Sequence, residues 1–239
     1  MTIQRKFIMM LLLISSLFLL VAVIIVWRST SVELRNNLEL QQENLQRELV
    51  NSLSLTDMLL SQQVKASMQV FQQTLQEKGE FSTGTVQKVG TMTVPDLLIG
   101  GIGQANNFAL VDKHSVLLGG TATLFSRAGE QYIRVSTNVQ TENGRAVGTA
   151  LAPDGAAMQA IRAHKPYAGH VDILGNPFIT AYQPLEDAAG ETIGIAYVGY
   201  KADLDELNQL VSNSKLLEQG FVALIDDKGV VRAQSKHMT

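Results

Sequence analysis

Two arginines stand where they could recognise a small anion. Arginine carries a planar, permanently charged fork of N–H donors that matches the two oxygens of a carboxylate. Arg134 lies between the apolar residues Ile133 and Val135 in an alternating segment. On a half-buried strand those neighbours face one way and Arg134 faces the other, toward either a pocket or solvent. Arg145 follows Gly144 in a hairpin-type turn, where the alternative role is that of a solvated turn residue.

Hydroxyl groups could complete such a site. The candidates are Thr137, Thr149 and Thr180 as hydrogen-bond donors, and Tyr167 and Tyr182 as parts of a pocket wall. All five are residue types that more often have a plain role in a strand. Asp172 could bind a ligand ammonium or pair with an arginine, and pairing is the favoured role. The predicted ligand-binding residues are therefore Arg134, Arg145, Thr137, Tyr167, Asp172, Thr180 and Tyr182.

Several function classes lack support in the sequence. The four histidines have no HExxH-type spacing, and there is neither a Gly-x-Ser-x-Gly elbow nor a phosphate-binding loop. The absence of cysteine excludes disulfides, zinc–thiolate sites and cysteine nucleophiles. The 22 acidic and 19 basic residues include no basic block, which argues against a nucleic-acid partner. We predict no enzymatic activity, no cofactor and no metal, although acid–base pairs of carboxylates leave no signature in a sequence.

The elements that position these residues begin with an uncharged apolar run at residues 7–27. As a helix it would rise about 30 Å, which is the thickness of a bilayer's hydrocarbon core. Arg5 and Lys6 precede the run, and Trp27 and Arg28 close it. A cleaved signal peptide is the alternative, but its apolar region would span only about 7–15 residues and end in a small-residue cleavage site. The run predicts a transmembrane anchor, and the positive-inside rule slightly favours residues 1–6 in the cytoplasm.

A long amphipathic helix is expected at residues 28–78, where neither proline nor glycine occurs. Apolar residues recur there at steps of three, four and seven. They are Leu45, Leu49, Leu53, Leu60, Val64, Met68, Phe71 and Leu75. The stripe could pack on the domain that follows, on a second copy of itself, or on each in turn. We expect a contact between two copies, and hence a homodimer through this helix.

Short β-like runs follow the helix. A stretch rich in glycine and proline at 79–103 predicts a loop, and strands are expected at 108–112, 121–126, 132–138, 170–174, 178–183 and 192–200. Asn143-Gly144 and residues 187–190 are turn signals. Short helices are expected at 155–163, with Asp154 as a candidate N-cap, and at 204–217. A long helix followed by antiparallel strands predicts an α+β fold with one sheet.

Six motifs follow one another in a specific order between residues 95 and 202. They are LGGTATLF (118–125), YIRVSTN (132–138), GRAVGT (144–149), YAGHVDILG (167–175), TAYQP (180–184) and IGIAYVG (193–199). Their order and spacing resemble the Cache family of extracellular sensor domains, in particular the Cache3-type modules, sometimes fused to a Cache2-type module, of bacterial chemoreceptors and related signalling proteins. The resemblance implies a PAS-like antiparallel sheet packed on a long N-terminal helix. It also implies a small-molecule pocket on one face of the sheet, with carboxylates and amino acids as frequent ligands.

The resemblance assigns the predicted elements to a sensor. Residues 79–202 become the Cache-like domain, and Arg145 falls within one of its motifs, which implies a place in the pocket or at its rim. The expected function is the sensory, ligand-binding region of a bacterial transmembrane chemoreceptor, anchored in the inner (plasma) membrane with the sensor on the periplasmic or extracellular side. The alternatives are the sensor half of a cyclase, phosphatase or histidine kinase, and a structural module whose stalk dimerises.

A second Cache-like module is expected from residue 203, after a linking helix. The segment VALIDDKG (222–229) echoes FALVDKHS (108–115), and both read as an apolar strand that runs into an aspartate-led turn. The first follows the long helix and the second follows the helix predicted at 204–217. Since residues 203–239 would hold only the start of such a module, we expect either a fragment of a longer receptor or a truncated gene.

Overall fold

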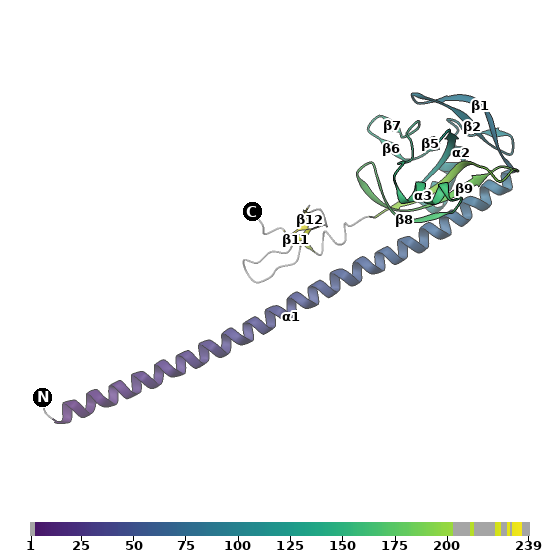
Figure 1. Cartoon of the computed structure of the whole chain (residues 1–239). Helices are drawn as coiled ribbons and strands as arrows, with labels where there is room; N and C mark the ends of the chain where they lie inside the picture. The colour runs from purple at the N-terminus through teal and green to yellow at the C-terminus, as the bar shows by residue number, and fades with distance from the viewer. Residues whose placement is uncertain (1–2, 203–210, 213–222, 226–228, 230, 236–239) are drawn as a thin grey trace. The chain divides into compact units, whose positions relative to one another are not determined.

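The computed structural model describes residues 3–202, 211–212, 223–225, 229 and 231–235 (Figure 1). The chain forms two compact units. One is Ser54–Asp203, which holds the sheet and the predicted site, and the other comprises Met1–Leu53 and Leu204–Thr239. The α+β class that the sequence predicts is confirmed.

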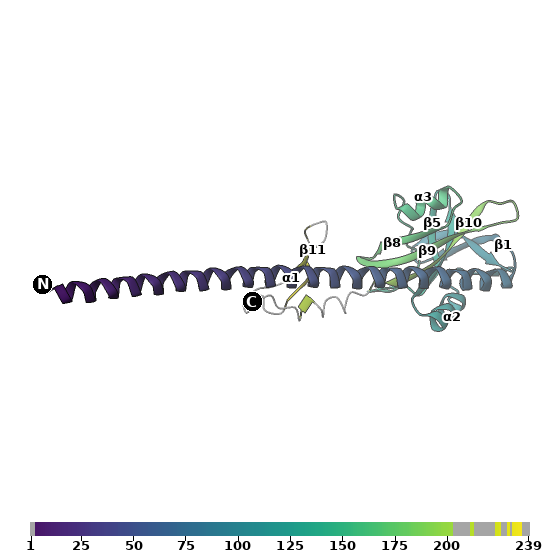
Figure 2. The same ribbon diagram turned by 90° about the horizontal axis from the view of Figure 1, so that it is seen from below.

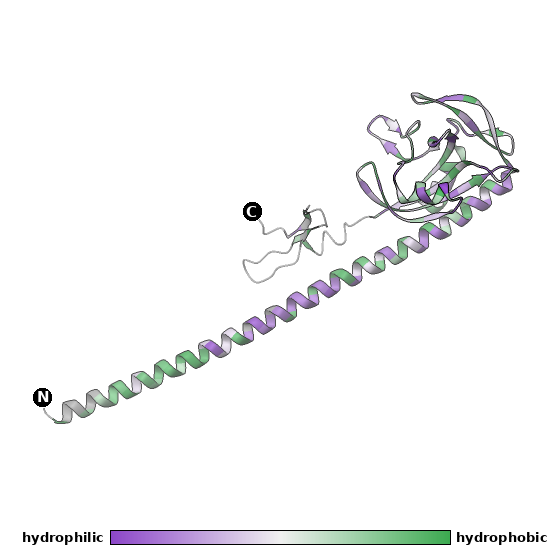
Figure 3. Ribbon diagram, viewed as in Figure 1, coloured by the Kyte–Doolittle hydropathy of each residue, from purple (hydrophilic) through white to green (hydrophobic). Residues whose placement is uncertain are grey.

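The first helix, α1 (Ile3–Lys78), runs through 76 residues without a break, as the lack of proline and glycine predicts. Its N-terminal segment is apolar and its middle is hydrophilic (Figure 3). Side chains of the apolar segment are exposed, Trp27 by 71%, and by length and composition this helix could cross a membrane.

The remaining elements of the larger unit are short. They are β1 (Phe81–Val89), β2 (Met92–Ile99), β3 (Ile102–Gly103), α2 (Ala109–Leu118), β4 (Thr121–Ala128), β5 (Gln131–Thr137), β6 (Gln140–Thr141), β7 (Gly144–Arg145), α3 (Ala156–Arg162), β8 (Tyr167–Ile173), β9 (Asn176–Glu186) and β10 (Thr192–Lys201). In the other unit, β11 (Ala223–Ile225) and β12 (Val231–Gln234) form a hairpin.

The central sheet is antiparallel with the strand order β5-β4-β10-β9-β8. The expectation of one sheet is wrong, because β1, β2 and β3 form a separate three-stranded sheet. One face of the central sheet buries Val135, Leu124 and Val198 against Phe71 and Leu75 of α1. Side chains alternate along a strand, so the intervening residues form a second apolar cluster on the other face, where α3 packs. Figure 2 shows α3 and α2 on opposite sides of this sheet. The sheet thus separates an α1-facing core from an α3-facing core.

Three local predictions are wrong. Residues 108–112 are not a strand, because Ala109–Leu118 is the helix α2, which buries Val111 and His114 one turn apart. The first segment of the predicted internal echo is therefore helical, whereas 223–225 is a strand as expected. The 79–103 region is a hairpin of β1 and β2 turning at Gly90, whose φ is 60°. The N-cap of α3 is Gly155 and not Asp154.

The other strand predictions agree with the structure to within a few residues, as do the turns at Asn143-Gly144 and at 187–190. The helix predicted at 204–217 lies almost wholly outside the described residues. Within it the structure describes only residues 211–212, which are helical.

Candidate ligand-binding site

One row of side chains on the α3-facing side of the sheet carries a hydroxyl group on every strand. The pairing registers align Thr137 with Thr123, Thr123 with Tyr197, Tyr197 with Tyr182, and Tyr182 with Tyr167. All but Tyr167 are nearly inaccessible to solvent. A polar stripe inside an apolar cluster is costly unless the hydroxyl groups find partners.

Arg134 lies beside this row on β5 and is only 7% exposed. It is paired across the strands with Phe125, and its guanidinium carbon lies 5.0 Å from the centroid of that ring. Nη1 donates a hydrogen bond of 2.7 Å to Oγ1 of Thr149, while Nε has no partner among the described residues. The alternation with Ile133 and Val135 thus turns Arg134 into the molecule and not toward solvent.

The loop at 146–151 holds Thr149 over Arg134 by pairing with β5 as a short extra strand. The Arg134 N–H donates to the Thr149 carbonyl oxygen, and the Gly148 N–H donates to the Arg134 carbonyl oxygen, each at 2.9 Å. Oγ1 of Thr149 in turn donates to the Ala146 carbonyl oxygen at 2.8 Å. The Arg134 side chain is therefore covered by a loop whose backbone is fixed to the same strand.

The charge of Arg134 has no counter-ion among the residues that the structure describes. The one buried carboxylate there is Asp96, whose Oδ1 accepts hydrogen bonds from the N–H groups of Gln104 and Ala105. Burial lowers the pKa of Arg134, and it raises the pKa of Tyr182 to about 12, so Tyr182 stays neutral. A buried guanidinium without a carboxylate is an unusual and costly arrangement.

Tyr182 adds a second unpaired polar group. Its hydroxyl is buried and has no hydrogen-bond partner among the described residues. The neighbouring Tyr197 hydroxyl lies 3.0 Å from Oγ1 of Thr121. The positive charge of Arg134 acts on the pKa of both phenols, which places the guanidinium and the two rings in one electrostatic environment.

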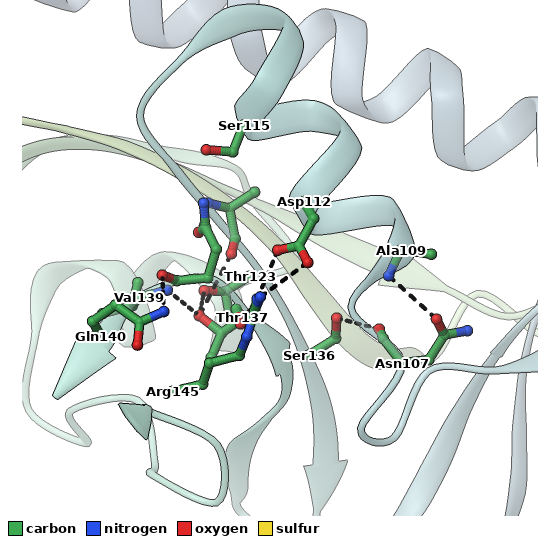
Figure 4. A network of polar contacts seen from close by, with 12 residues as sticks. Asn107, Ala109, Asp112, Ser115, Thr123, Ser136, Thr137, Val139, Gln140 and Arg145 are labelled. Carbon is green, nitrogen blue, oxygen red and sulfur yellow. Dashed lines mark hydrogen bonds and ion pairs between the residues drawn. The ribbon is translucent and has the colours of Figure 1, made fainter. Parts of the chain in front are cut away.

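Arg145 points into a different network, drawn in Figure 4. Its two terminal nitrogens donate to the carboxylate of Asp112 on α2 at 2.6 and 3.0 Å, and Nη1 also donates to the Thr137 carbonyl oxygen at 2.9 Å. Its guanidinium carbon lies 4.4 Å from the centroid of the Phe108 ring. Arg145 therefore has the counter-ion that Arg134 lacks, and its contacts join α2 to the sheet.

The structure distributes the other predicted ligand-binding residues over three locations. Thr137 and Tyr167 end the hydroxyl row, with Thr137 bonded to Oγ1 of Thr123 at 2.6 Å. Thr180 is buried and donates to the Gly169 carbonyl oxygen at 2.9 Å. Asp172 is exposed near the end of β8, where its Oδ1 accepts from the Gly175 N–H of the following turn at 2.8 Å. Arg134, Thr137, Tyr167, Thr180 and Tyr182 thus share one side of the sheet, whereas Arg145 and Asp172 are engaged elsewhere.

Sequence reasoning missed Thr123, Tyr197 and Phe125 as neighbours of Arg134. Phe125 faces Arg134 through the pairing of the consecutive strands β4 and β5, whose register contains a bulge. Tyr197 joins them only through the pairing of β4 with β10, far apart in the chain. No group of three or more histidine or acidic side chains in the described part of the chain could hold a metal ion.

A cleft of about 170 Å³ opens near the end of α3. Arg127, Arg162 and Glu191 are among its lining residues, together with Tyr132, two residues before Arg134. Glu130 also lines the cleft, so two arginines face two glutamates there, and Nη1 of Arg127 lies 3.6 Å from a carboxylate oxygen of Glu191. The cleft therefore differs from the surroundings of Arg134, which has no acidic partner among the described residues.

A sequence model of the Cache 3/Cache 2 fusion domain matches residues 28–235. The chain belongs to this Cache family. The match confirms the resemblance that the six motifs carry and agrees with the observed sheet and long helix. Cache sensor domains bind ligands and are not themselves catalytic.

Solved sensor domains resemble parts of this Cache chain. The sensor domain of the Vibrio cholerae histidine kinase DctB is 19% identical over 55% of this chain and 50% of its own, with a TM-score of 0.35. The sensory domain of the Campylobacter jejuni chemoreceptor Tlp3 is 12% identical over 82% and 73%, with a TM-score of 0.37. The ligand-binding domain of the Pseudomonas aeruginosa amino-acid chemoreceptor PctC, in complex with GABA, is 14% identical over 78% and 73%, with a TM-score of 0.39. This chain thus spans half of the DctB sensor chain, and no curated protein sequence matches it.

Proposed function

We propose that this chain is the sensory region of a bacterial transmembrane chemoreceptor, which binds a small molecule outside the inner membrane and transmits the event through α1. Three features support the proposal. The chain is a Cache member, one end of α1 could cross a membrane, and the α3-facing side of the sheet buries Arg134 and Tyr182 with polar atoms that have no partner among the described residues. A sensor at the end of a membrane-spanning helix suits a receptor.

The main support for the proposal is that the buried charge of Arg134 has no counter-ion among the described residues. A buried guanidinium with one side-chain hydrogen bond has donors to spare, and an anion would satisfy them and neutralise the charge. Arg134 is the principal ligand contact that we propose, with Tyr182 beside it and Thr137, Tyr167 and Thr180 around the same row. Arg145 and Asp172, which are engaged elsewhere, would act at most on the position of these elements.

The sheet offers a direct route from ligand to helix. Arg134 faces the site, while its neighbours Ile133 and Val135 belong to the core that packs against Phe71 and Leu75 of α1. A ligand that prefers one position of β5 would therefore bias the packing on α1 and shift the population of two arrangements. We propose that the exposed stripe of α1 pairs with that of a second copy, so that the shift reaches the membrane through a dimer of helices.

The alternative is the sensor half of a histidine kinase, cyclase or phosphatase. The partial likeness to a histidine kinase sensor and to a chemoreceptor sensor does not favour either function. The gene sequence beyond residue 239 decides between them: a long heptad-patterned cytoplasmic helix would support a chemoreceptor, and a catalytic motif would support a sensor enzyme.

Ligand binding by the full chain in nanodiscs tests the proposal. All five tyrosines lie in β5, β8, β9 and β10, so near-ultraviolet circular dichroism of tyrosine reports on the sheet. We expect a library of small anions and amino acids to contain compounds that raise the unfolding temperature of this signal. Arg134→Gln should abolish that shift, while Arg127→Gln, a change to the exposed arginine paired with Glu191, should preserve it. A shift that is the same in Arg134→Gln would remove Arg134 from the site.

A further inference from the structure

We propose that the domain also senses protons, through two histidines that contact α1 and respond to acid in opposite directions. His114 on α2 and His170 on β8 each contact a polar side chain of this helix. Acid should weaken the contact of α2 with α1 and strengthen the contact of β8 with α1. The proposal concerns a stimulus other than the small molecule and does not depend on Arg134.

The contact of α2 with α1 requires a neutral histidine. His114 is only 4% exposed, and its Nε2 lies 2.8 Å from Oγ of Ser67 on α1. Its ring packs on Phe71 with the ring centroids 4.6 Å apart, beside the buried Val111. A proton taken up here would place a charge among apolar side chains, so it favours a state in which His114 has left α1 and reached water.

No acidic side chain among the described residues offsets a charge on His114. Burial alone lowers the pKa of this histidine, without a contribution from a neighbouring charge. Charged residues do occur on α2 and on the parts of α1, β4 and β5 near it. They are Asp112, Arg127 and Arg134, which have partners elsewhere, and Lys65 and Lys113, which are exposed.

The contact of β8 with α1 becomes stronger when its histidine is charged. Nε2 of His170 lies 2.7 Å from Oδ1 of Asp57, and the two side chains are 67% and 48% exposed. A protonated imidazole makes this contact an ion pair, whereas a neutral imidazole makes a hydrogen bond only. Aspartate is ordinarily ionised above about pH 5, so protonation of the histidine adds attraction.

The other charged groups around His170 are acidic. Side chains two positions apart share a face of a strand, so Asp172 lies on the same side of β8 as His170. The neighbouring strand β9 places Ile179 opposite His170, and its one charged residue is Glu186 at the far end. Along α1, no other charged residue stands within one turn of Asp57. A charged His170 therefore has carboxylates and no second cation on this face of β8 among the described residues.

The two contacts lie at different places on α1. Asp57 and Ser67 are ten positions apart, which in a helix is about 15 Å along the axis and about 80° around it. Figure 2 shows α2 and β8 on opposite sides of α1. If one contact weakens while the other strengthens, a different orientation of α1 against the sheet becomes favoured. Because α1 continues into the segment that could cross a membrane, a change in pH would act on the same helix as the proposed ligand.

Distances between spin labels on the full chain in nanodiscs test the proposal. The chain has no cysteine, so cysteine pairs can be introduced at exposed positions. Gln63→Cys on α1 is combined with Val116→Cys on α2 or with Ala168→Cys on β8. Labelled chain is diluted with unlabelled chain, so that distances within one copy are measured. From about pH 8 to about pH 5.5, we expect the population with a longer α1–α2 distance to rise about threefold or more, and the α1–β8 distances to become shorter and narrower.

Substitutions of single histidines assign each response. His114→Gln should abolish the pH response of the α1–α2 pair only, and His170→Gln should abolish that of the α1–β8 pair only. His164→Gln is the matched control, because this histidine contacts Thr192 and Glu186 and not α1. It should leave both responses unchanged.

Tyrosine circular dichroism verifies that each variant is folded. If His114→Gln does not fold, His114→Phe gives the same test, because it keeps an aromatic ring against Phe71 and cannot titrate. Three results would overturn the proposal: an α1–α2 distance that is independent of pH in the wild type, a response that persists without His114, or α1–β8 distances that lengthen in acid. No small molecule is present in these measurements, so they leave the proposed ligand site at Arg134 to its own binding experiment.

Discussion

Tyr182 and Tyr197 face each other across β9 and β10 with ring centroids 5.0 Å apart, yet their hydroxyl groups differ in partners. The Tyr197 hydroxyl lies 3.0 Å from Oγ1 of Thr121, whereas the Tyr182 hydroxyl has no partner among the described residues. Two buried tyrosines that are neighbours in the sheet thus have opposite hydrogen-bonding status. The Tyr197 hydroxyl is satisfied by a neighbouring strand, and the Tyr182 hydroxyl is left over in this part of the structure.

Phenylalanine substitutions should separate these two roles. Tyr182→Phe removes an unsatisfied buried hydroxyl, so we expect the unliganded protein to be equally stable or more stable, by up to about 1–2 kcal/mol. Tyr197→Phe breaks a hydrogen bond and leaves Thr121 with its bond to the Gly199 carbonyl oxygen, so a loss of about 1 kcal/mol is expected. Urea unfolding in detergent micelles, followed by tyrosine circular dichroism, measures both changes. Equal losses in the two variants would contradict the assignment.

The ion pair of Arg145 and Asp112 should contribute to stability through geometry as well as charge. The guanidinium is bidentate, but the two side chains are 30% and 43% exposed, so solvent screens part of the attraction. We expect a coupling free energy of about 1 kcal/mol from a double-mutant cycle of Arg145→Gln and Asp112→Asn, measured by urea unfolding. Arg145→Lys should recover little of it, because lysine lacks the planar fork. Additive effects in the cycle would mean that the two residues act independently.

Much of the site could be foreseen from local pattern, because alternation is local. The apolar neighbours Ile133 and Val135 predict that Arg134 lies on the opposite face of the strand, and the structure shows that Arg134 is buried there. The predicted strands also follow from alternation and turn residues. The order β5-β4-β10-β9-β8 does not, because β4 pairs with a strand about 70 residues away, and the hydroxyl row exists only in that register.

The misjudged segments share a physical cause. Residues 108–112 are an apolar run that ends in an aspartate, which resembles a strand running into a turn, but the helix of Ala109–Leu118 is favoured because it buries Val111 and His114 against α1. Arg145 looked like an anion-binding residue since its partner Asp112 lies 33 positions earlier, on a helix that the sequence did not predict. Tertiary contact overrode local preference in both places.

Burial of His114 should make stability fall in acid. Its Nε2 lies 2.8 Å from Oγ of Ser67 on α1, its ring packs on Phe71 at 4.6 Å, and burial lowers its pKa below the ordinary value of 6.5. The unfolded chain therefore binds the proton first. Stability is full above about pH 6.5 and declines as the pH falls toward the folded-state pKa, by at most about 1.4 kcal/mol per pH unit.

Variants of His114 and Ser67 test whether His114 causes the loss of stability in acid. His114→Gln removes the titrating group, so urea unfolding at several pH values should show a shallower decline than in the wild type. Ser67→Ala removes the hydrogen-bond partner but keeps the histidine buried, so it should lower stability while retaining the slope. An unchanged slope in His114→Gln would show that other groups cause the acid sensitivity.

The same substitution at Arg134 and at Arg145 should change stability in opposite directions. Arg134→Met removes a buried charge that lacks a counter-ion, and Thr149 keeps its bond to the Ala146 carbonyl oxygen. We expect the unliganded protein to gain about 1–3 kcal/mol in free energy of unfolding. Arg145→Met instead leaves Asp112 without its partner and should destabilise the protein by about 1–2 kcal/mol.

Bound ligand should reverse the order of stability of the wild type and Arg134→Met. A compound that binds the wild type through this arginine raises its free energy of unfolding with concentration, whereas Arg134→Met should show no such rise. Urea unfolding with and without ligand measures both terms. If Arg134 serves binding at a cost to stability, Arg134→Met is the more stable protein without ligand and the wild type is the more stable protein with ligand. The reason is that the charge that destabilises the unliganded protein is the one that the ligand neutralises. A loss of unliganded stability in Arg134→Met would mean that the guanidinium serves the fold instead.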